Sequence, residues 1–341
     1  MHALLTTFWL RGMTAEEYGE LAERYAFRPG QALTVRRPDD AADERRTYSI
    51  CAPAGARPRI GVREVPGGLV SGWLVHDLRP GDRVEVAPPS GTFTPDLEAA
   101  GRHVLIAAGS GITPLLSIAA SLLRNPDVQV SLLYGNRRAD TVMFAEELAD
   151  LKDAHPSRLE LVHLLSREAR EVELLTGRLD AAKLRTLLPL LIDVPDVDHW
   201  WLCGPFGMIT DATEVLGEFG VAPRRIHREL FWVDEVPPAI VRADRTPDGP
   251  VSEVTVVLDG RSTTVTVAAG DSVLEGAQRS RPDLPFACKG GVCGTCRARV
   301  VEGEVTMRRN FALEAGEIAA GFVLTCQATP VTEKVVVDFD D

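Results

Sequence analysis

Cysteine is scarce in this chain and unevenly placed, so it is the first residue type to examine for chemistry. Six cysteines occur among 341 residues, yet Cys288, Cys293 and Cys296 fall together in the stretch "CKGGVCGTC". The next cysteine, Cys326 in "VLTCQA", follows after twenty-nine intervening residues. The spacing C-x4-C-x2-C with one distant cysteine is the plant-type ligand pattern for a [2Fe–2S] cluster, in which four thiolates hold two irons.

The residues between these cysteines fit the same interpretation. Gly290, Gly291 and Gly294 have no side chains, so the backbone can approach inorganic sulfides and adopt unusual dihedral angles. The alternative is a structural zinc site, but zinc ligands usually come as two short CxxC-like pairs. We therefore favour the iron–sulfur cluster. Cys51 and Cys203 lie far from this set, where a small buried side chain is the simplest role.

The flanks of the cysteine loop predict a small domain. "VSEVTVVLDG" and "RSTTVTVAAG" alternate like two strands around an Asp259–Gly260 turn, which is a hairpin signal. "DSVLEGAQRS" then predicts a helix capped by Asp271. With the closing strands that end in "VVVDFDD", this pattern predicts an α+β ferredoxin domain of the β-grasp type over residues 251–341.

The middle of the chain predicts a nucleotide-binding domain over residues 99–233. "HVLIAAGSGITPLLSIAASLL" has the pattern of a strand, a glycine turn and a helix, an arrangement that suits a pyrophosphate. A plain strand–turn–helix is the alternative for this segment alone. Three further apolar strands, "VQVSLLYGNR", "LELVHLLSRE" and "HWWLCGPFGM", alternate with helical patterns. That alternation indicates a parallel sheet, whose ligands bind beyond the carboxyl ends of its strands.

The first 98 residues have a different pattern. "FRPGQALTVR", "RRTYSICAP", "IGVREVP" and "DRVEVAPPSG" are short, turn-bounded segments that predict a small antiparallel β-barrel. A proline-rich segment, residues 234–250, predicts a linker before the last domain. The chain is therefore expected to be a multidomain protein with a β-barrel domain, an α/β domain and a ferredoxin domain.

Charge and hydropathy exclude some partners. The formal net charge is −12, so nucleic acid is not an expected partner. The uncharged segment 104–123 is interrupted by "GSGITP", which favours a buried strand, turn and helix over a membrane span. With no signal-peptide pattern at the N-terminus, we expect a soluble, cytoplasmic protein.

Several motifs, in their order along the chain, resemble one known family. "RTYS", "GSGITP", "YGNR" and "CGP", followed by the cysteine loop, resemble ferredoxin–NADP+-reductase-like flavoprotein reductases with a C-terminal plant-type ferredoxin. "YSIC", "LPFACKGGVCGTC" and the "VVVDFD" tail resemble the reductase subunits of bacterial ring-1,2-phenylacetyl-CoA epoxidases in particular. The resemblance covers about residue 26 to the end of the chain.

The resemblance implies an FAD site in the barrel. Arg46 would hold the FAD pyrophosphate, Tyr48 would pack against the isoalloxazine ring, and Ser49 would bond near its N5 atom. Gly68 and Ser71 resemble a second flavin-phosphate turn. Taken alone, Tyr48 is better explained as a strand residue in the barrel wall, and Ser71 could equally be only a helix N-cap.

The resemblance also implies residues for the dinucleotide. Gly109, Gly111 and Thr113 would line it, while Gly204 and Pro205 would lie near the nicotinamide.

Three further residues are expected beside the flavin. Cys203 is a candidate for assisting hydride transfer, with buried packing as the alternative. Glu229 and Phe231, in "HRELF", occupy the position where the family places its last strand beside the flavin.

The choice between NADPH and NADH depends on cationic groups, because a 2′-phosphate needs them and NADH is usually held by a carboxylate. Ser166 and Arg167 resemble the 2′-phosphate pair of ferredoxin reductases, and Arg137 and Arg138 lie nearby in the pattern. Solvated arginines are the alternative. We expect NADPH.

These parts together imply an electron-transfer reductase. Electrons would pass from NADPH to FAD, then to the [2Fe–2S] cluster, and singly to an outside acceptor. The resemblance implies that this acceptor is a di-iron oxygenase subunit that epoxidises the ring of phenylacetyl-CoA. One alternative is the reductase of another ring-hydroxylating oxygenase, including one that uses FMN. Another, of a different class, is a non-enzymatic module that binds zinc at the four cysteines.

Two more expectations concern particular segments. The N-terminal segment departs from the family pattern, because residues before "YAFRPGQ" look partly helical and the first barrel strand is expected to be missing or replaced.

Basic residues near the cysteine loop are candidates for docking an acidic oxygenase surface, with a mixed solvated surface as the alternative. These residues are Arg279, Arg281, Lys289, Arg297, Arg299, Arg308 and Arg309.

Overall fold

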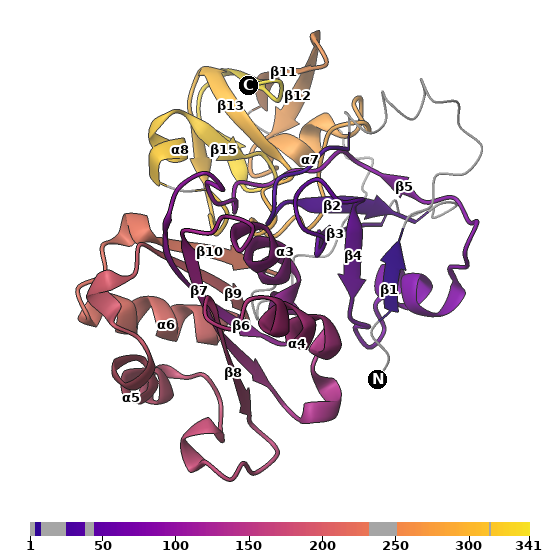
Figure 1. Ribbon diagram of the computed structural model, residues 1–341. Helices are drawn as coiled ribbons and strands as arrows, with labels where there is room; N and C mark the ends of the chain where they lie inside the picture. Colours follow the sequence, from indigo (N-terminus) through magenta and orange to yellow (C-terminus); the bar gives the residue numbers. More distant parts are fainter. Residues whose placement is uncertain (1–3, 8–24, 38–43, 232–250, 314) are drawn as a thin grey trace. The chain divides into compact units, whose positions relative to one another are not determined.

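The computed structural model describes residues 4–7, 25–37, 44–231, 251–313 and 315–341. The chain divides into two compact units, Met1–Trp232 and Val233–Asp341. In Figure 1 the first unit runs from indigo to red-orange, and the second from orange to yellow. The predicted linker, residues 234–250, lies outside the described residues.

A parallel β-sheet forms one part of the first unit, as the alternation of strands and helices predicted. Its strands follow the spatial order β10-β9-β6-β7-β8. They are β6 (Gly101–Ala108), β7 (Val128–Asn136), β8 (Leu159–Leu165), β9 (His199–Gly204) and β10 (Ile226–Leu230). Most of these strands are apolar along their length because helices cover both faces of the sheet.

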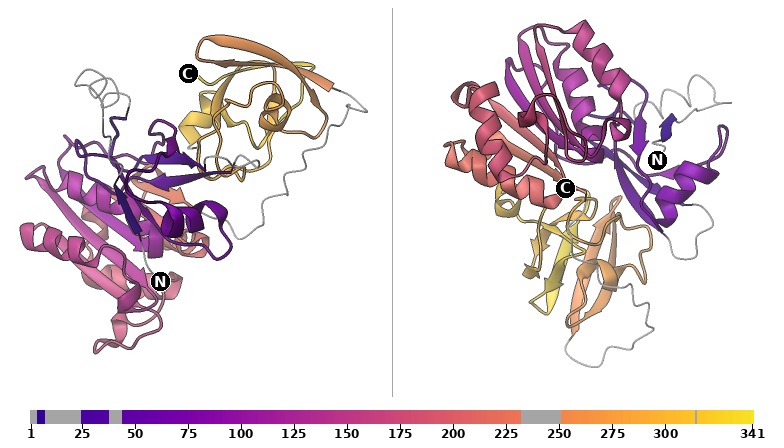
Figure 2. Two further views of the ribbon diagram at one scale, coloured as in Figure 1. Left: turned by 90° about the vertical axis from the view of Figure 1, so that its right-hand side faces the viewer. Right: turned by 90° about the horizontal axis from the view of Figure 1, so that it is seen from below.

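Helices connect the strands and define where a ligand can bind. They are α3 (Ile112–Leu122), α4 (Ala145–Ala154), α5 (Ala181–Leu191) and α6 (Phe206–Glu218). Because such crossovers are right-handed, α3 and α4 cover one face of the sheet while α5 and α6 cover the other (Figures 1 and 2). The winding reverses between the neighbouring strands β6 and β9. The carboxyl ends of these two strands are therefore the expected position of a bound nucleotide.

Short antiparallel strands form the barrel part of the first unit. They are β1 (Leu4–Thr7), β2 (Ala32–Arg36), β3 (Arg45–Ser49), β4 (Arg59–Val62) and β5 (Glu85–Val86). Strand β2 pairs with β3 and β5, β1 pairs with β4, and an Ile50–Ile60 bridge connects the two groups. Leu33, Val35, Ile50, Ile60 and Leu74 are buried inside this wall. The prediction of an antiparallel β domain is confirmed.

The N-terminal segment differs from the expectation in one respect. A first strand is present: β1 pairs antiparallel with β4, from Leu4 opposite Val62 to Thr7 opposite Arg59. The apolar "LLTT" segment can pair with the exposed edge of β4, and this pairing was hidden by the helical pattern that follows it. The helical interpretation of residues 8–24 lies outside the described residues.

Polar contacts connect the barrel to the sheet within the first unit. The Arg59 guanidinium pairs with both carboxylate oxygens of Glu147 on α4, with 3.1 Å between Nη1 and Oε1. The Ser121 hydroxyl on α3 accepts a hydrogen bond from the Ala54 N–H at 2.9 Å. A two-pronged arginine–carboxylate pair adds orientation as well as energy. These contacts hold the barrel against the face of the sheet that carries α3 and α4.

The second unit contains a mixed sheet in the order β12-β11-β17-β13-β15. The strands are β11 (Val251–Leu258), β12 (Arg261–Ala268), β13 (Arg297–Glu302), β15 (Phe322–Leu324) and β17 (Lys334–Asp338). A second pair joins β14 (Val305–Met307) to β16 (Ala328–Pro330), and the helices are α7 (Val273–Ala277) and α8 (Ala315–Ala319). Strand β17 lies parallel to β11 and antiparallel to β13, so the C-terminal strand sits in the middle of the sheet.

The predicted helix α7 is present, but its cap differs from the expectation. Its N-cap is Ser272, not Asp271. The Ser272 hydroxyl accepts a hydrogen bond from the Glu275 N–H, and the Glu275 carboxylate accepts one from the Ser272 N–H. This reciprocal pair satisfies two backbone donors, whereas an Asp271 cap would leave Glu275 without that role.

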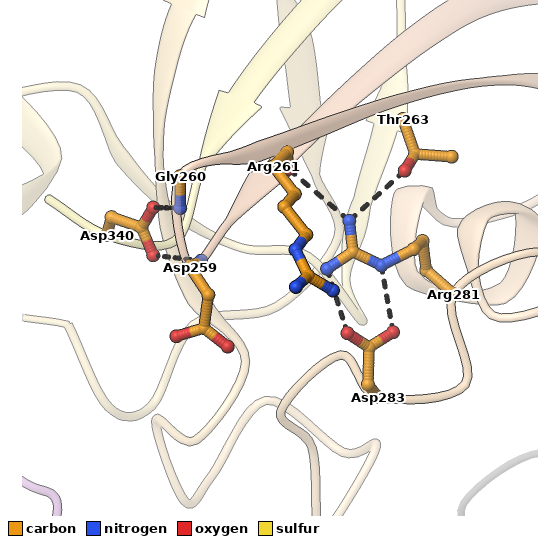
Figure 3. A network of polar contacts seen from close by, with 7 residues as sticks. All are labelled: Asp259, Gly260, Arg261, Thr263, Arg281, Asp283 and Asp340. Carbon is orange, nitrogen blue, oxygen red and sulfur yellow. Dashed lines mark hydrogen bonds and ion pairs between the residues drawn. The ribbon is translucent and has the colours of Figure 1, made fainter.

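The predicted turn between β11 and β12 is confirmed, and the C-terminal tail binds it (Figure 3). Asp259 and Gly260 have φ angles of 53° and 66°, as a two-residue hairpin turn requires. The Asp340 carboxylate accepts hydrogen bonds from the N–H groups of Asp259 and Gly260, at 2.7 and 2.8 Å. The tail "VVVDFDD" therefore supplies a side-chain cap for the hairpin.

Arg281 makes a second connection to the same hairpin (Figure 3). Its guanidinium donates to the Arg261 carbonyl at 3.3 Å, to the Thr263 hydroxyl at 3.1 Å, and to both oxygens of Asp283 at 2.8 Å. The side chain is only 11% exposed, and its hydrogen bonds lower the pKa of Asp283. Arg281 thus ties the segment after α7 to the edge strand β12.

We expect Asp340→Ala to loosen the hairpin turn, because two backbone N–H groups would lose a charged acceptor. The loss of about 1 kcal/mol corresponds to a roughly fivefold faster amide hydrogen exchange at Asp259 and Gly260. Exchange measured on the full chain would test this, with the exposed Glu333→Ala as the matched loss of one acidic side chain. Equal exchange in the two variants would contradict the role assigned to the tail.

Candidate functional site

The four predicted cluster cysteines lie in two pairs. The Cys293 thiol donates to the Cys288 sulfur, and this contact lowers the pKa of Cys288 to about 5 despite burial. The Cys296 thiol donates in the same way to Cys326 and lowers its pKa. The N–H groups of Gly290, Val292 and Cys293 also point at the Cys288 sulfur, at 3.3, 3.4 and 3.4 Å. These donors favour a thiolate at Cys288.

The loop that carries three of these cysteines depends on left-handed backbone positions. Lys289, Gly291 and Gly294 have φ angles of 49°, 77° and 68°. A Cβ atom on Gly291 would lie 3.0 Å from the Gln327 side chain, which in turn donates to the Lys289 carbonyl at 2.9 Å. Gln327 directly follows Cys326, so this bond brings the distant cysteine to the loop.

Paired thiols fit two irons better than one zinc ion. A [2Fe–2S] cluster places two thiolates on each iron, whereas structural zinc gathers four ligands around a single point. The Cys288/Cys293 and Cys296/Cys326 pairs match the arrangement that two irons need.

A second group of chemically active side chains gathers at the end of the parallel sheet. The Ser49 hydroxyl, at the end of β3, donates to the Glu229 carboxylate on β10 at 3.1 Å. The Cys203 sulfur on β9 lies 4.0 Å from the same Glu229 oxygen. The strand register explains this meeting, because Glu229 pairs with Cys203 between β10 and β9. Residues 180 positions apart thus form one polar group.

Burial sets the protonation of this group. The Glu229 side chain retains some solvent contact, yet the protein atoms crowded around it raise its pKa to about 8, while the Ser49 hydrogen bond opposes that rise. Burial also raises the pKa of the Cys203 thiol. At pH 7 both groups therefore carry protons, so neither of them places a negative charge at the ends of β9 and β10.

The glycine turn after β6 lies against the end of β9. A Cβ atom on Gly111 would lie 2.0 Å from the Cys203 carbonyl oxygen, so only glycine allows this approach. Gly109 has a φ angle of 57°, and the Thr113 hydroxyl donates to the Ser110 carbonyl at 2.9 Å. A backbone turn this close to two strand ends provides the crevice that a dinucleotide requires.

Other residues at this edge follow the same geometry. Gly204 ends β9, and a Cβ atom there would lie 2.7 Å from the Met208 side chain. Pro205 occupies the N-cap position of α6. Phe231, directly after β10, is 39% exposed. All of them lie at the carboxyl ends of β9 and β10.

One cation at this site was not predicted from the sequence. Arg63 directly follows β4, and its guanidinium lies where a Cβ atom on Gly109 would be 2.6 Å away. The motif "GVREV" gave no signal for this contact, since the arginine looks like any strand-end residue. Only the packing of the barrel beside the sheet brings its charge to the glycine turn.

The barrel residues implied by the resemblance differ in exposure: Arg46 is exposed, Tyr48 is half-buried and Ser71 is buried. Arg46 is exposed and pairs with Glu44 at 2.6 Å. Burial raises the pKa of Tyr48 to about 12, and Arg46 opposes that shift. The Ser71 hydroxyl accepts from the Val65 N–H at 3.1 Å and donates to the Gly68 carbonyl at 3.3 Å. Ser71 therefore stabilises its own turn.

The expected 2′-phosphate residues are adjacent at the ends of β7 and β8. The Ser166 N–H donates to the Asn136 carbonyl at 2.9 Å, and the Arg167 N–H donates to the Arg137 carbonyl at 2.8 Å. Arg137 and Arg167 are exposed. Arg138 is held by an ion pair with an aspartate two residues further along, at 3.3 Å. The structure thus brings Arg137, Ser166 and Arg167 together.

The basic residues around the cysteine loop mostly bind partners inside the second unit. Arg297 pairs with Glu317 at 3.0 Å, and Arg299 pairs with Asp341 at 3.3 Å. Arg279, Arg281 and Lys289 also contact partners there, namely Asp271, Asp283 and Gln278. Internal carboxylates therefore pair with four of these arginines, and docking of an acidic oxygenase surface at this face stays a prediction.

Among the described residues, no helix is both long and apolar enough to cross a membrane.

Two family models match the chain: an oxidoreductase NAD-binding domain over residues 105–214, and a 2Fe-2S iron-sulfur cluster binding domain over residues 256–331. The fold and the site thus define a pyridine-nucleotide oxidoreductase with an iron–sulfur domain.

Similar proteins narrow this class. The chain is 43% identical to a subunit of 1,2-phenylacetyl-CoA epoxidase from Escherichia coli K12, over 94% of this chain and 90% of that protein. It is 32% identical to the ferredoxin reductase component of 3-ketosteroid-9-alpha-monooxygenase from Rhodococcus rhodochrous, over 94% of this chain and 90% of that protein. The structure of phthalate dioxygenase reductase has a similar fold, with a TM-score of 0.55 at 24% identity over 92% and 88% of the two chains.

The chain belongs to the family of flavin- and [2Fe–2S]-containing reductase components of oxygenase systems, which includes this phenylacetyl-CoA epoxidase component. It is an oxidoreductase whose electrons pass from NAD(P)H to FAD and then to the [2Fe–2S] cluster.

The raised pKa of Glu229 predicts a stability change with pH. Its folded pKa of about 8 exceeds the ordinary value of 4.5, so its contribution to stability is complete below pH 4.5 and is lost as pH rises toward 8. We expect Glu229→Gln to flatten the fall of the melting temperature between pH 5 and pH 9. Ser49→Ala should extend the fall to higher pH, because it removes the hydrogen bond that lowers this pKa. Identical pH profiles for both variants and the parent chain would contradict the assignment.

Proposed function

We propose that this chain is the NADPH-dependent reductase that supplies single electrons to the di-iron oxygenase of a phenylacetyl-CoA epoxidase, in the cytoplasm. The observation that carries this proposal is the 43% identity to the phenylacetyl-CoA epoxidase component of Escherichia coli over nearly the whole chain. The grouping of Ser49, Cys203 and Glu229 beside the glycine turn, and the paired cysteines, support the electron route. We assign the domains to residues 1–98 for FAD, 99–233 for the dinucleotide and 251–341 for the cluster, with a linker at 234–250.

The barrel residues would hold FAD. Arg46 would turn from Glu44 to the flavin pyrophosphate, for which a guanidinium is a suitable two-pronged donor. Tyr48 offers a partly buried ring for the isoalloxazine, and Ser49 offers a hydroxyl near its reactive nitrogen. Gly68 and Ser71 would shape a second phosphate turn. Bound FAD supplies the conversion of a two-electron donation into single-electron steps.

The sheet residues would hold the dinucleotide against the flavin. Gly109, Gly111 and Thr113 would receive the pyrophosphate, and the nearby Arg63 guanidinium would neutralise it. Gly204 and Pro205 leave room for a nicotinamide at the end of β9.

The residues at the end of β9 and β10 would tune the hydride step. The Ser49 hydroxyl orients the Glu229 carboxyl group, which holds a proton at neutral pH. The Cys203 thiol packs behind it, and Phe231 would shield the position from water. An uncharged environment of this kind does not oppose the approach of a hydride donor.

The cluster ligands would be Cys288, Cys293, Cys296 and Cys326. The cluster supplies one-electron transfer to the oxygenase. The chain itself is not proposed to activate oxygen, and nucleic acid and membrane are not proposed as partners.

A second candidate acceptor has its own support. The chain is also 32% identical to the reductase component of a ketosteroid monooxygenase, over a similar share of its length. The electron route would be the same, and only the oxygenase would differ. Reduction of purified di-iron epoxidase subunits, compared with reduction of a ring-hydroxylating oxygenase, would separate the two candidates.

A visible spectrum recorded without oxygen tests the electron route. We expect flavin and iron–sulfur absorbance that both bleach when NADPH is added. In Cys326→Ala the iron–sulfur absorbance should be lost while the flavin still bleaches, because that variant removes one ligand of one iron only. A colourless parent chain that also fails to take up FAD, iron and sulfide would contradict the proposal and favour the zinc-binding alternative.

Arg167→Ala tests the preference for NADPH. Loss of a charged partner for the 2′-phosphate should raise KM for NADPH about tenfold while leaving KM for NADH unchanged. Arg228→Ala, an exposed arginine on the opposite edge of the sheet, controls for the change in net charge. A higher kcat/KM for NADH than for NADPH in the parent chain would refute the NADPH assignment.

A further inference from the structure

Cys326 lies between two buried polar residues, and both of them bind the cysteine loop. Thr325 is fully buried and Gln327 is 4% exposed. The Thr325 hydroxyl and N–H donate to the Cys296 carbonyl at 2.9 and 3.0 Å. The Gln327 amide donates to the Lys289 carbonyl at 2.9 Å, at the other end of the loop. The distant cysteine is therefore held to the loop from both sides.

The Gln327 amide also contacts the cysteine that precedes it. Its Nε2 atom lies 3.0 Å from the Cys326 carbonyl oxygen and 3.5 Å from the Cys326 sulfur. The partners of this nitrogen are thus two carbonyls and a sulfur, and a flipped amide would direct its oxygen at three acceptors. The nitrogen carries two N–H groups. With one of them on the Lys289 carbonyl, the other is shared by the carbonyl and the sulfur of Cys326.

This hydrogen bond differs in kind from those at the first cysteine. The donors at Cys288 are backbone N–H groups, which remain when a side chain is replaced. Cys326 also receives a hydrogen bond from a side chain. An apolar residue could fill the space of Gln327, but it could donate neither to the Lys289 carbonyl nor to the sulfur. The identity of this one residue therefore decides whether the sulfur has that donor.

A donor at a ligand sulfur affects how readily the metal centre accepts an electron. Reduction by one electron adds negative charge to the irons and their sulfur ligands, and an N–H directed at a sulfur stabilises that charge. Burial strengthens the effect, because little water screens the dipole of the amide. Gln327 itself is neither oxidised nor reduced, since the electron comes from the flavin and leaves to the outside acceptor.

We propose that Gln327 raises the reduction potential of the [2Fe–2S] cluster through its hydrogen bond to the Cys326 sulfur, while its bond to Lys289 fixes the position of that cysteine. The proposal deepens the proposed function and rests on its assignment of the four cysteines as cluster ligands. Gln327 is a positioning residue, because it acts through a ligand and does not bind iron.

The test removes the donor and keeps the shape of the side chain. Gln327→Met has a similar length and no N–H group, so the midpoint potential of the cluster should fall. In a redox titration followed by electron paramagnetic resonance, the ratio of reduced to oxidised cluster at a fixed potential should drop about fivefold, which is about 40 mV for one electron. The melting temperature should fall as well, because the Lys289 carbonyl loses this donor.

Two control variants separate donation to the sulfur from structural support. The Gln278 side-chain oxygen accepts a hydrogen bond from the Lys289 ammonium group at 2.8 Å, so Gln278→Met removes a polar contact to the same loop residue. Thr325→Val removes the hydroxyl bond on the other side of Cys326. Neither of these bonds involves a sulfur atom. Both variants should therefore keep the parent potential, even where the melting temperature falls.

A second measurement needs no substitution at Gln327. The full chain can be produced with the heavy nitrogen isotope in the side-chain amides of its glutamines. Electron–nuclear double resonance on the reduced cluster should then show a coupling to the labelled nitrogen, and Gln278→Met should retain it. This measurement decides the question if Gln327→Met takes up no cluster.

An unchanged potential in a cluster-containing Gln327→Met protein would overturn the proposal, and so would a parent cluster that shows no coupling to the labelled amide. In both cases the proposed function would stand. A parent chain that takes up no iron and sulfide, even on reconstitution, would overturn both.

Discussion

The close approach of the glycine turn to the end of β9 is the constraint on which the oxidoreductase site depends. Gly111 has no room for a Cβ atom, because the Cys203 carbonyl would lie 2.0 Å away. This contact joins β6 to β9 at the point where the winding of the sheet reverses. The same register then places Glu229 beside Cys203. A side chain on Gly111 would push the turn away from the strand that carries Cys203.

The barrel completes this site from outside the sheet. Ser49 and Arg63 come from barrel strands, yet one bonds Glu229 and the other lies against Gly109. The pair between Arg59 and Glu147 holds the two parts together within the first unit. Because protein atoms crowd the Glu229 carboxyl group and the Cys203 thiol, both groups hold protons at neutral pH. Neither group would therefore repel an anionic ligand.

The second unit has a separate structural requirement, because it must hold four sulfur atoms around a small inorganic core. Left-handed residues bend the loop, and Gln327 fastens it to the strand that carries Cys326. The C-terminal tail adds rigidity at a distance, since Asp340 caps the β11–β12 turn and Asp341 pairs with Arg299. Most of the basic residues near the loop are engaged in this framework.

The sequence by itself determined the features that depend on local spacing. The cysteine pattern, the strand–turn–helix with its glycines, the hairpin turn at Asp259 and the three kinds of domain all follow from neighbouring residues. Local patterns failed where two signals competed, as when Asp271 was preferred to Ser272 as a helix cap. The helical pattern after β1 similarly hid that strand.

Only the tertiary structure decided which distant groups meet. The approach of Arg63 to Gly109 and the hydrogen bond between Ser49 and Glu229 leave no mark in the sequence around these residues. Burial, hydrogen-bond satisfaction and pKa are properties of a whole environment, and that environment is assembled from segments up to 180 residues apart. The sequence could therefore indicate which kind of chemistry the protein performs. The packing of the barrel against the sheet was needed to show how the side chains of the site are brought together.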